Sequence, residues 1–283
     1  MDSEVNKVLY EVEDTKEFQM LGQGNTAEIY QYEEHKILKL FREGMPLPPI
    51  ENEYRISSLV QSEVHNVPRV YEIVKYRDRI GIVYEQIVGK GMIQLFLGHF
   101  FQLKQYAKQF ASIHLSVHEN DIDVHTSLKD KLRWDIDSTS DLTSSEKEKI
   151  KQYLNTLPDK NKLCHFDFHP GNIIYRGNDP VVIDWMTGCT GDPNADVART
   201  LLLMRMGEMM HINPFVKTAL HFFTKRVGKM YWKEYQRISG VSTNEVEKWI
   251  LPVAAARLSE WLTDHERKKL VSLVKKELAS LAD

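Results

Sequence analysis

Apolar and polar residues alternate in short runs through the first third of the chain, and from about residue 92 the apolar positions mostly recur every third or fourth residue. Strand-like runs separated by turns cover residues 18–21, 27–30, 36–41, 67–76 and 80–84. Runs of this kind predict β-hairpins. The one helical stripe among them, at residues 50–61, follows prolines that suit a first helical turn. The pattern predicts a small antiparallel sheet with one helix.

The later part of the chain reads as helices, interrupted between residues 163 and 185 by short apolar runs of strand type. Residues 86–91 contain two glycines and break both patterns, which predicts a linker. We therefore expect an α+β chain with two lobes. The first would span residues 1–87, and the second, larger and mainly helical, would span residues 88–283.

Three polar side chains stand out around the interruption. Asp167 lies in a loop between two apolar runs, Asn172 follows five residues later, and Asp184 ends the next strand-like run. Loops at strand ends often carry functional groups. Two carboxylates and a carboxamide can hold a hydroxyl group and one or two Mg²⁺ ions against the phosphates of a nucleotide.

Gly22 and Gly24 lie one residue apart between two predicted strands. Glycines there allow a backbone to approach a polyphosphate and to present N–H groups to it. No helix follows, so the pair is not a dinucleotide fingerprint, and the sequence contains no P-loop. A purely structural role in a hairpin remains the alternative.

Lys39 is a charge inside an otherwise apolar strand, on the same face as Ile37. An inward lysine needs an anionic partner, either a phosphate or a carboxylate. Glu53 shares the apolar face of the predicted helix with Ile56 and Val60, so it points inward. The two residues form a candidate ion pair, whose alternatives are an edge lysine in water and a solvated helix charge.

The composition excludes several functional classes. The chain has 283 residues, 42% of them hydrophobic and 27% charged, and a net charge of −3. The sequence pI near 6.4 argues against a nucleic-acid binder with a broad basic surface. The first residues lack an apolar signal segment, and no apolar run approaches the ~18 residues of a membrane span. We therefore expect a cytoplasmic protein with no membrane partner.

Neither the two cysteines nor a pair of histidines indicates a disulfide framework or a metal site. Cys164 and Cys189 are not spaced as a CxxC motif. His114 and His118 lie four residues apart, but no third ligand is evident from the sequence. We expect neither zinc nor a disulfide.

The arrangement His165-x-Asp167-x-x-x-x-Asn172, followed by Asp184, closely resembles the catalytic and metal-binding loops of the aminoglycoside phosphotransferase and choline kinase family. That family shares the two-lobed fold of protein kinases. The run His-Pro-Gly-Asn at residues 169–172 is similar to this family and not to protein kinases, whose loop usually contains a lysine or arginine. The resemblance extends over nearly the whole chain.

Two positions depart from the family pattern. Phe166 stands where the family commonly has glycine after the loop histidine, and Ala27 stands where a third glycine of the glycine loop could be. The first departure bears on how tightly the catalytic loop can turn. Neither removes a reacting group.

The resemblance implies an Mg²⁺-dependent kinase that transfers the γ-phosphoryl group of ATP or GTP to a hydroxyl of a small molecule. Asp167 would orient that hydroxyl and accept its proton, Asn172 and Asp184 would coordinate Mg²⁺, and Lys39, paired with Glu53, would contact the phosphates. The loop would be supported by His165 and by Asp196 of the next helix. The other candidate nucleotide contacts are Gly22, Gly24, Asn25, Thr26, Ile29, Ile37, Gln86 and Ile87.

Acidic and aromatic residues of the helical part are the candidates for acceptor binding, since they suit an amine-bearing alcohol. They are Trp134, Asp135, Glu260, Trp261 and Asp264. Two alternatives stay open: a nucleotide-binding regulatory protein without turnover, and a protein or peptide kinase. The sequence leaves the choice between ATP and GTP, the acceptor and the oligomeric state open.

Overall fold

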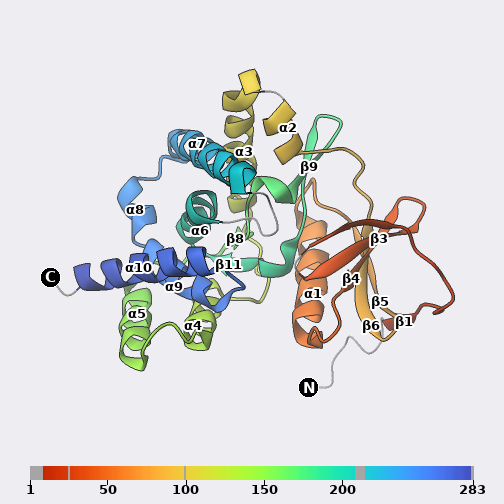
Figure 1. Cartoon of the computed structure of the whole chain (residues 1–283), viewed down its shortest axis with the longest axis horizontal. Coiled ribbons are helices and arrows are strands. Elements are labelled where there is room, and N and C mark those ends of the chain that lie inside the picture. Colours follow the sequence, from red (N-terminus) through yellow and green to blue (C-terminus); the bar gives the residue numbers. More distant parts are fainter. Residues whose placement is uncertain (1–8, 25, 99, 208–213, 282–283) are drawn as a thin grey trace. The chain divides into compact units, whose positions relative to one another are not determined.

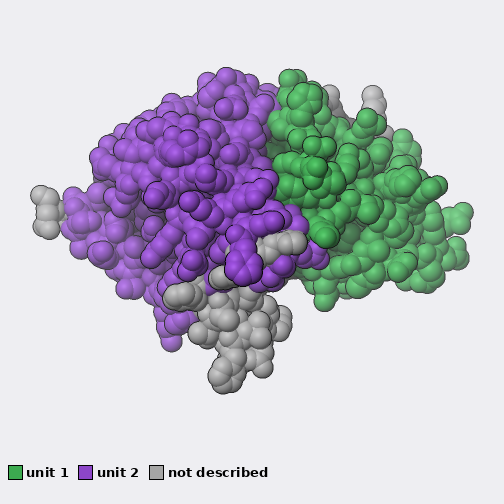
Figure 2. Space-filling model, turned by 90° about the horizontal axis from the view of Figure 1, so that it is seen from above, with its two compact units in different colours: residues 1–92, 171–188 green, residues 93–170, 189–283 purple. Residues whose placement is uncertain are grey.

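The computed structural model describes residues 9–24, 26–98, 100–207 and 214–281. The chain forms two compact units (Figure 2). The first unit comprises residues 1–92 and 171–188, and the second comprises residues 93–170 and 189–283.

The unit boundaries differ from the expected ones in two respects. The first unit continues to residue 92 instead of ending at residue 87, and it also takes residues 171–188, which we assigned to the second lobe. A hairpin from late in the chain therefore belongs to the N-terminal unit. No local pattern predicts this, because hairpin signals do not say which sheet or helix the hairpin packs on.

The first unit contains a six-stranded sheet with the strand order β1-β5-β6-β4-β3-β2 (Figure 1). The strands are β1 (Leu9–Glu11), β2 (Met20–Gln23), β3 (Ala27–Glu33), β4 (Lys36–Phe41), β5 (Val70–Tyr76) and β6 (Arg79–Glu85). The predicted hairpins are present, and all of their pairings are antiparallel. The short β1, which runs parallel to β5, was not predicted.

Helix α1 (Leu47–Glu63) covers one face of this sheet (Figure 1). It includes the predicted range and begins directly after Pro46. Ile50 of α1 packs in a buried cluster with Phe41 and Ile82, whereas Leu38 and Leu40 pack in a second cluster with other residues of the sheet. The period of two along β4 therefore holds, and Lys39 lies on the α1 side.

A smaller sheet with the order β10-β9-β7 completes the first unit. It consists of β7 (Lys90–Gly91), β9 (Ile173–Arg176) and β10 (Asp179–Val182). After β10, the short helix η4 (Trp185–Thr187) packs against α1. This packing holds residues 171–188 in the first unit.

The second unit is mainly helical and contains one two-stranded sheet, β8 (Lys162–Cys164) with β11 (Cys189–Gly191). Its helices are α2 (Met92–Gly98), η2 (Phe100–Gln102), α3 (Leu103–His118), α4 (Leu128–Ser138), α5 (Ser144–Thr156), η3 (Pro170–Asn172), α6 (Pro193–Met206), α7 (Pro214–Ser239), α8 (Thr243–Glu247), α9 (Ile250–Ala256), η5 (Arg257–Ser259) and α10 (Asp264–Ser280). The first residue of α2 and the last two residues of η3 are assigned to the first unit. No helix in the described ranges is long and apolar enough to cross a membrane.

A buried polar cluster lies in the core of the second unit, where α3, α6 and α7 meet. Asp196 of α6 faces Nε2 of His114 at 3.3 Å and Nε2 of His118 at 3.2 Å. The Nδ1 atoms of the two rings hydrogen-bond to the hydroxyls of Tyr231 and Tyr235, each at 2.7 Å. The structure thus supplies a third group beside the histidine pair that the sequence left without one. His118 is hydrogen-bonded through both ring nitrogens and His114 through Nδ1, whereas Nε2 of His114 is buried beside Asp196 without a hydrogen bond.

Burial, with His118 beside it, lowers the pKa of His114 to about 3 and outweighs the opposing charge of Asp196. In the unfolded chain the ring has its ordinary pKa near 6.5. As the pH falls below about 6.5, the unfolded state binds a proton that the folded state does not. The burial of a neutral His114 ring therefore stabilises the folded state fully above about pH 6.5, and this stabilisation is lost as the pH falls toward 3.

We predict that His114→Gln flattens the dependence of the unfolding free energy on pH between about 6.5 and 5 by up to about 1.4 kcal/mol per pH unit. Chemical denaturation at several pH values measures the slope. His35→Gln, which replaces an exposed histidine, serves as the control and should leave the slope as in the wild type. An unchanged slope in the His114 variant would contradict a neutral buried ring.

Candidate active site

The loop that carries Asp167 follows β8 in the second unit, and its backbone is held by Asp196 of α6. The carboxylate of Asp196 accepts the N–H of His165 at 2.7 Å and the N–H of Phe166 at 3.1 Å. Asp196 is fully buried, so these two bonds are not exposed to competing water. The support of the loop by Asp196, which the resemblance implies, is present in this geometry.

Phe166 adopts the left-handed backbone conformation, with φ of 58°. A bulky residue pays of order 1–3 kcal/mol for such a conformation, whereas glycine pays little. This explains why glycine suits the position. Here the strain is offset by packing, because the Phe166 ring is buried and the guanidinium of Arg199 lies 5.0 Å from its centroid. The phenylalanine is therefore compatible with a tight loop.

The carboxylate of Asp167 lies between two cationic or ionisable groups. Nε2 of His169 is 3.5 Å from one carboxylate oxygen, and Nη2 of Arg199 is 3.6 Å from the other. Burial alone would raise the pKa of Asp167, but His169 and Arg199 outweigh it and hold the pKa well below its usual range. Asp167 is therefore ionised at neutral pH.

The sequence missed Arg199 as a site residue. It lies one helical turn after Asp196 in α6, among apolar positions that are buried around it. An arginine in such a stretch needs a buried anion. That mismatch was the available signal, and it was the same signal that singled out Lys39.

Two of the acidic acceptor candidates lie close to Arg199. Glu260, directly after η5, accepts a hydrogen bond from Nη1 of Arg199 at 2.5 Å. Asp135 of α4 pairs with Lys131 at 3.2 Å, and its charge also acts on Arg199. The second unit therefore brings Asp167, Glu260 and Asp135 around one arginine, although they are far apart in sequence.

The aromatic candidates are mostly exposed. The exposed fraction is 76% for Trp134, which precedes Asp135, and 73% for Trp261, which follows Glu260. Asp264 is exposed at the start of α10. These side chains are free of the hydrophobic core, so their surfaces are available to a ligand.

The first unit contains the predicted ion pair. Nζ of Lys39 lies 2.7 Å from Oε1 of Glu53 and 2.9 Å from Oδ1 of Asp184. The hydroxyl of Tyr84 donates to the same Oε1 at 2.9 Å. Lys39 is 9% exposed and Glu53 is 1% exposed. Both alternatives, an edge lysine in water and a solvated glutamate, are therefore wrong.

The charge on Lys39 is strongly stabilised. Burial alone would lower its pKa, but the carboxylates of Asp184 and Glu53 outweigh burial and raise the pKa of Lys39 above its usual range. The lysine therefore stays protonated at neutral pH. A buried ammonium between two carboxylates is a fixed point charge that can face a phosphate.

Asn172 and Asp184 lie at the same end of the hairpin formed by β9 and β10. The N–H of Ile183 donates to the carbonyl of Asn172 at 3.0 Å, which ties the two positions together. Asp184 has φ of 66° and ψ of 67°, a left-handed conformation that turns the chain out of the strand direction. Carboxylate and carboxamide oxygens are the ligands that Mg²⁺ prefers, so this donor set fits the ion.

The glycine loop connects β2 and β3. At Gly22 a side chain would meet open space, whereas the N–H of Gly24 donates to the carbonyl of Ala27 at 2.8 Å within the turn. That N–H is thus used by the hairpin itself, and Asn25 lies outside the described residues. Among the other candidates of this sheet, Thr26 has a carbonyl that accepts the N–H of Arg42.

Ile29 of β3 pairs directly with Lys39 of β4. Ile37 lies two residues before Lys39 on β4 and therefore shares its face. Both are in position to flank a group that the lysine contacts.

Gln86 and Ile87, which follow β6, are predicted nucleotide contacts, but several groups of Gln86 are already bonded within the first unit. The N–H of Gln86 donates to the carbonyl of His35 at 2.8 Å, and the side chain of Gln86 pairs with that of Gln31 at 2.9 Å. The Gln86 N–H is therefore already bonded within the first unit and is not available to a nucleotide. Contact through the rest of Gln86 and Ile87 stays a prediction.

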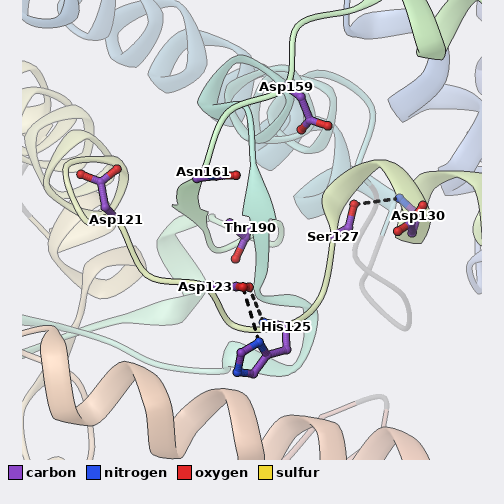
Figure 3. Close-up of a pocket in the computed structure, with 8 residues that line it drawn as sticks. All are labelled: Asp121, Asp123, His125, Ser127, Asp130, Asp159, Asn161 and Thr190. Carbon is purple, nitrogen blue, oxygen red and sulfur yellow. Dashed lines mark hydrogen bonds and ion pairs between the residues drawn. The ribbon is translucent and has the colours of Figure 1, made fainter.

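A separate acidic hollow of about 710 Å³ opens in the second unit (Figure 3). Its acids are already balanced by neighbours: Asp121 pairs with Lys162, and Asp123 accepts the N–H of His125. The lining residues are Asp121, Asp123, His125, Ser127, Asp130, Asp159, Asn161 and Thr190. None of the predicted site residues is among them.

Comparison with known proteins places the chain in a family. The model of the phosphotransferase enzyme family, APH, matches residues 17–229. A crystal structure of an aminoglycoside-3'-phosphotransferase of type VIII is 17% identical, with 85% of this chain and 93% of that chain covered and a TM-score of 0.58. The complex of streptomycin, ATP and APH(2")-IIa is 18% identical, with 98% and 96% covered and a TM-score of 0.58. No curated protein matches the sequence.

A choline kinase from Cryptosporidium parvum Iowa II is 14% identical, with 94% of this chain and 90% of that chain covered and a TM-score of 0.51. At these identities the likenesses show the fold, and they confirm the predicted α+β, protein-kinase-like architecture. Since the family model matches most of the sequence and the fold agrees with it, the chain belongs to the phosphotransferase enzyme family and is a phosphotransferase.

Proposed function

We propose that this kinase transfers the γ-phosphoryl group of ATP or GTP to a hydroxyl group of a small, amine-bearing molecule, with Mg²⁺ as cofactor. The observation that carries the proposal is the buried Lys39, held at hydrogen-bond distance by both Glu53 and Asp184. A protonated lysine held beside a carboxylate that can bind Mg²⁺ is the arrangement that the phosphates of a bound nucleotide require. A protein of the same fold has been solved with ATP and streptomycin, which supports both substrate classes.

On the phosphate side, Lys39 contacts the α- and β-phosphates while Glu53 keeps its ammonium group in place. Asn172 and Asp184 hold Mg²⁺, which neutralises charge on the phosphates when bound. Nothing among the described residues lies within 4 Å of where a side chain at Gly22 would begin, so the glycine loop is open to a nucleotide on that side. All of these residues belong to the first unit.

On the acceptor side, Asp167 accepts a hydrogen bond from the reacting hydroxyl and then its proton. Because its pKa lies well below the usual range, it is a weak base. Its main contribution is therefore orientation. The proton moves only as the hydroxyl oxygen bonds to the γ-phosphorus and the bond from that phosphorus to the β–γ bridging oxygen breaks, so that the nucleoside diphosphate leaves. This suits a loose phosphoryl-transfer transition state, in which positioning matters more than deprotonation.

An amine-bearing acceptor is supported by the acidic and aromatic residues that the second unit carries. Asp135 and Asp264 supply negative charge, and the exposed rings of Trp134 and Trp261 can stack on a cationic group. A protein or peptide acceptor is disfavoured, because the sequence has no Ala-Pro-Glu segment after the metal-binding loop and carries the His-Pro-Gly-Asn run.

The direct test is an acceptor screen. Purified protein is incubated with Mg·ATP or Mg·GTP and a panel of aminoglycosides and amino alcohols, each matched with a neutral sugar or alcohol of similar size. Nucleotide consumption and the mass of the acceptor are measured, and thermal shifts report binding in parallel. Nucleotide binding without phosphorylation of any panel member would favour the regulatory alternative, and phosphorylation of added peptides would favour a protein kinase.

We predict that Asp167→Asn lowers kcat by about 10²–10⁴-fold. The amide keeps the shape of the side chain but loses the negative charge that orients the hydroxyl and takes its proton. Asp167 is not among the proposed nucleotide contacts, so nucleotide affinity should stay within a fewfold. Steady-state kinetics and nucleotide titration measure the two quantities. Asp159→Asn, which changes an exposed aspartate of the same unit, is the control. Ordinary turnover by the Asp167 variant would show that its assigned role is wrong.

We predict that Asp184→Asn removes the Mg²⁺-dependent part of nucleotide binding. The variant loses the anionic ligand of the ion, so its Kd for the nucleotide with Mg²⁺ should rise at least about tenfold, which is about 1.4 kcal/mol. Calorimetric titration with Mg²⁺ and with EDTA measures the difference. The control variant is Asp179→Asn, which changes an exposed residue at the start of β10 in the same hairpin. It should bind the nucleotide as the wild type does. Equal Mg²⁺ dependence in both variants would rule out Asp184 as a ligand.

A further inference from the structure

A row of alternating charges connects Asp167 with helix α10 inside the second unit. Arg199 lies 3.6 Å from Asp167 and 2.5 Å from Glu260. Glu260 also faces Arg257 at 3.3 Å, and Arg257 bonds to Glu266 at 2.7 Å. The row therefore begins at the catalytic loop and ends in the first turn of α10, where Thr263 caps the backbone N–H of Glu266.

The inner members of the row are buried. The side chains of Arg199, Arg257 and Glu266 expose 7%, 3% and 5% of their surface. Nε of Arg199 and Nη1 of Arg257 are buried with no hydrogen-bond partner among the described residues. A buried guanidinium is tolerated only beside anions, so neither arginine can leave its carboxylates without a large energetic cost. The geometry of the row is therefore rigid.

Arg199 comes from the same helix that holds the backbone of the catalytic loop. Asp196 binds the loop N–H groups, and Arg199, one turn later, lies over the ring of Phe166 and beside the carboxylate of Asp167. The loop itself contains His-Pro-Gly-Asn and no lysine or arginine. The cation next to the acceptor-facing aspartate is thus supplied from outside the loop.

We propose that Arg199 is a positioning residue for Asp167, with Glu260 as its anchor: the guanidinium holds the carboxylate in its anionic form and fixes its direction toward the acceptor. This inference rests on the proposed function, in which Asp167 receives the acceptor hydroxyl. The charge of Glu260 is compensated by two arginines, so Glu260 acts through Arg199. The remaining candidates for direct contact with the acceptor are Trp134, Asp135, Trp261 and Asp264.

The electrostatic surroundings make the proposal testable. Asp167 is faced by Arg199 and by the rings of His169 and His165, and Arg199 is faced by Asp167, Glu260 and Asp135. His169 lowers the pKa of Asp167 most and Arg199 comes next, so removing the charge of Arg199 leaves the two histidines alone to oppose the effect of burial. The pKa of Asp167 should then rise.

The experiment follows the carboxyl group of Asp167 by ¹³C NMR in the full-length protein, with the signal assigned by comparison with D167N. The wild type, R199M, R199K and R205M are titrated between about pH 8 and pH 4, above the ordinary pKa of aspartate near 3.9. R205M is the matched control, because Arg205 is an exposed residue of the same helix. R199K keeps a buried positive charge and guards against loss of folding in R199M.

In the wild type and R205M, the Asp167 signal should stay that of a carboxylate throughout the range. In R199M it should titrate within the range, and in R199K it should remain flat, as in the wild type. A flat signal in R199M, or a titrating signal in R199K equal to that in R199M, would overturn the proposal. If R199M does not fold, the kcat of R199K relative to the wild type decides.

The NMR readout needs neither an acceptor nor a nucleotide. Failure of the acceptor screen would therefore count against the proposed function and leave this test intact. If an acceptor is found, both R199M and R199K should lower kcat at least about tenfold with little change in the KM for the nucleotide. Both variants lose the planar guanidinium fork, which reaches Glu260 with Nη1 and Asp167 with Nη2. Wild-type kcat in R199K would show that the fork does not position Asp167.

Discussion

The arrangement of the catalytic loop depends on one buried carboxylate. Asp196 accepts two successive N–H groups of the loop and faces two histidine rings, and it has no contact with solvent. Because the next loop residue, Asp167, follows directly on these two bonds, its direction is set by a helix and not by the loop itself. A polar group without access to solvent costs free energy unless its hydrogen bonds are made, so only one arrangement of this network is favourable.

Both units hold a cation between carboxylates. In the first unit Lys39 lies between Glu53 and Asp184, and in the second Arg199 lies between Asp167 and Glu260. Each cation is buried, so it cannot swing away when a ligand arrives. Charges that are fixed before the reaction need no reorganisation during it, which is the general advantage of a preorganised site.

The two left-handed residues of the site show where the fold stores strain. Phe166 precedes Asp167, and Asp184 is itself one of the two metal-ligand candidates. The left-handed conformation is costly for a bulky phenylalanine and less so for aspartate, and the surroundings hold both residues in it. For Phe166 the compensation is a buried ring under Arg199, and for Asp184 it is the ion pair with Lys39. Stability elsewhere in each unit thus maintains the functional geometry.

The sequence alone determined the hairpins of the first unit, its helix, and the ion pair of Lys39 with Glu53. These follow from periods of two and of about 3.6 residues, which say which side chains share a face. It also indicated the loop of Asp167 and the Asn172 and Asp184 pair, because their residues lie close together in the chain. Only the tertiary structure decided that residues 171–188 join the first unit, that the N–H of Gln86 bonds to the carbonyl of His35, and that Arg199 lies beside Asp167. Such contacts depend on which distant faces meet, and periodicity within a segment carries no information about that.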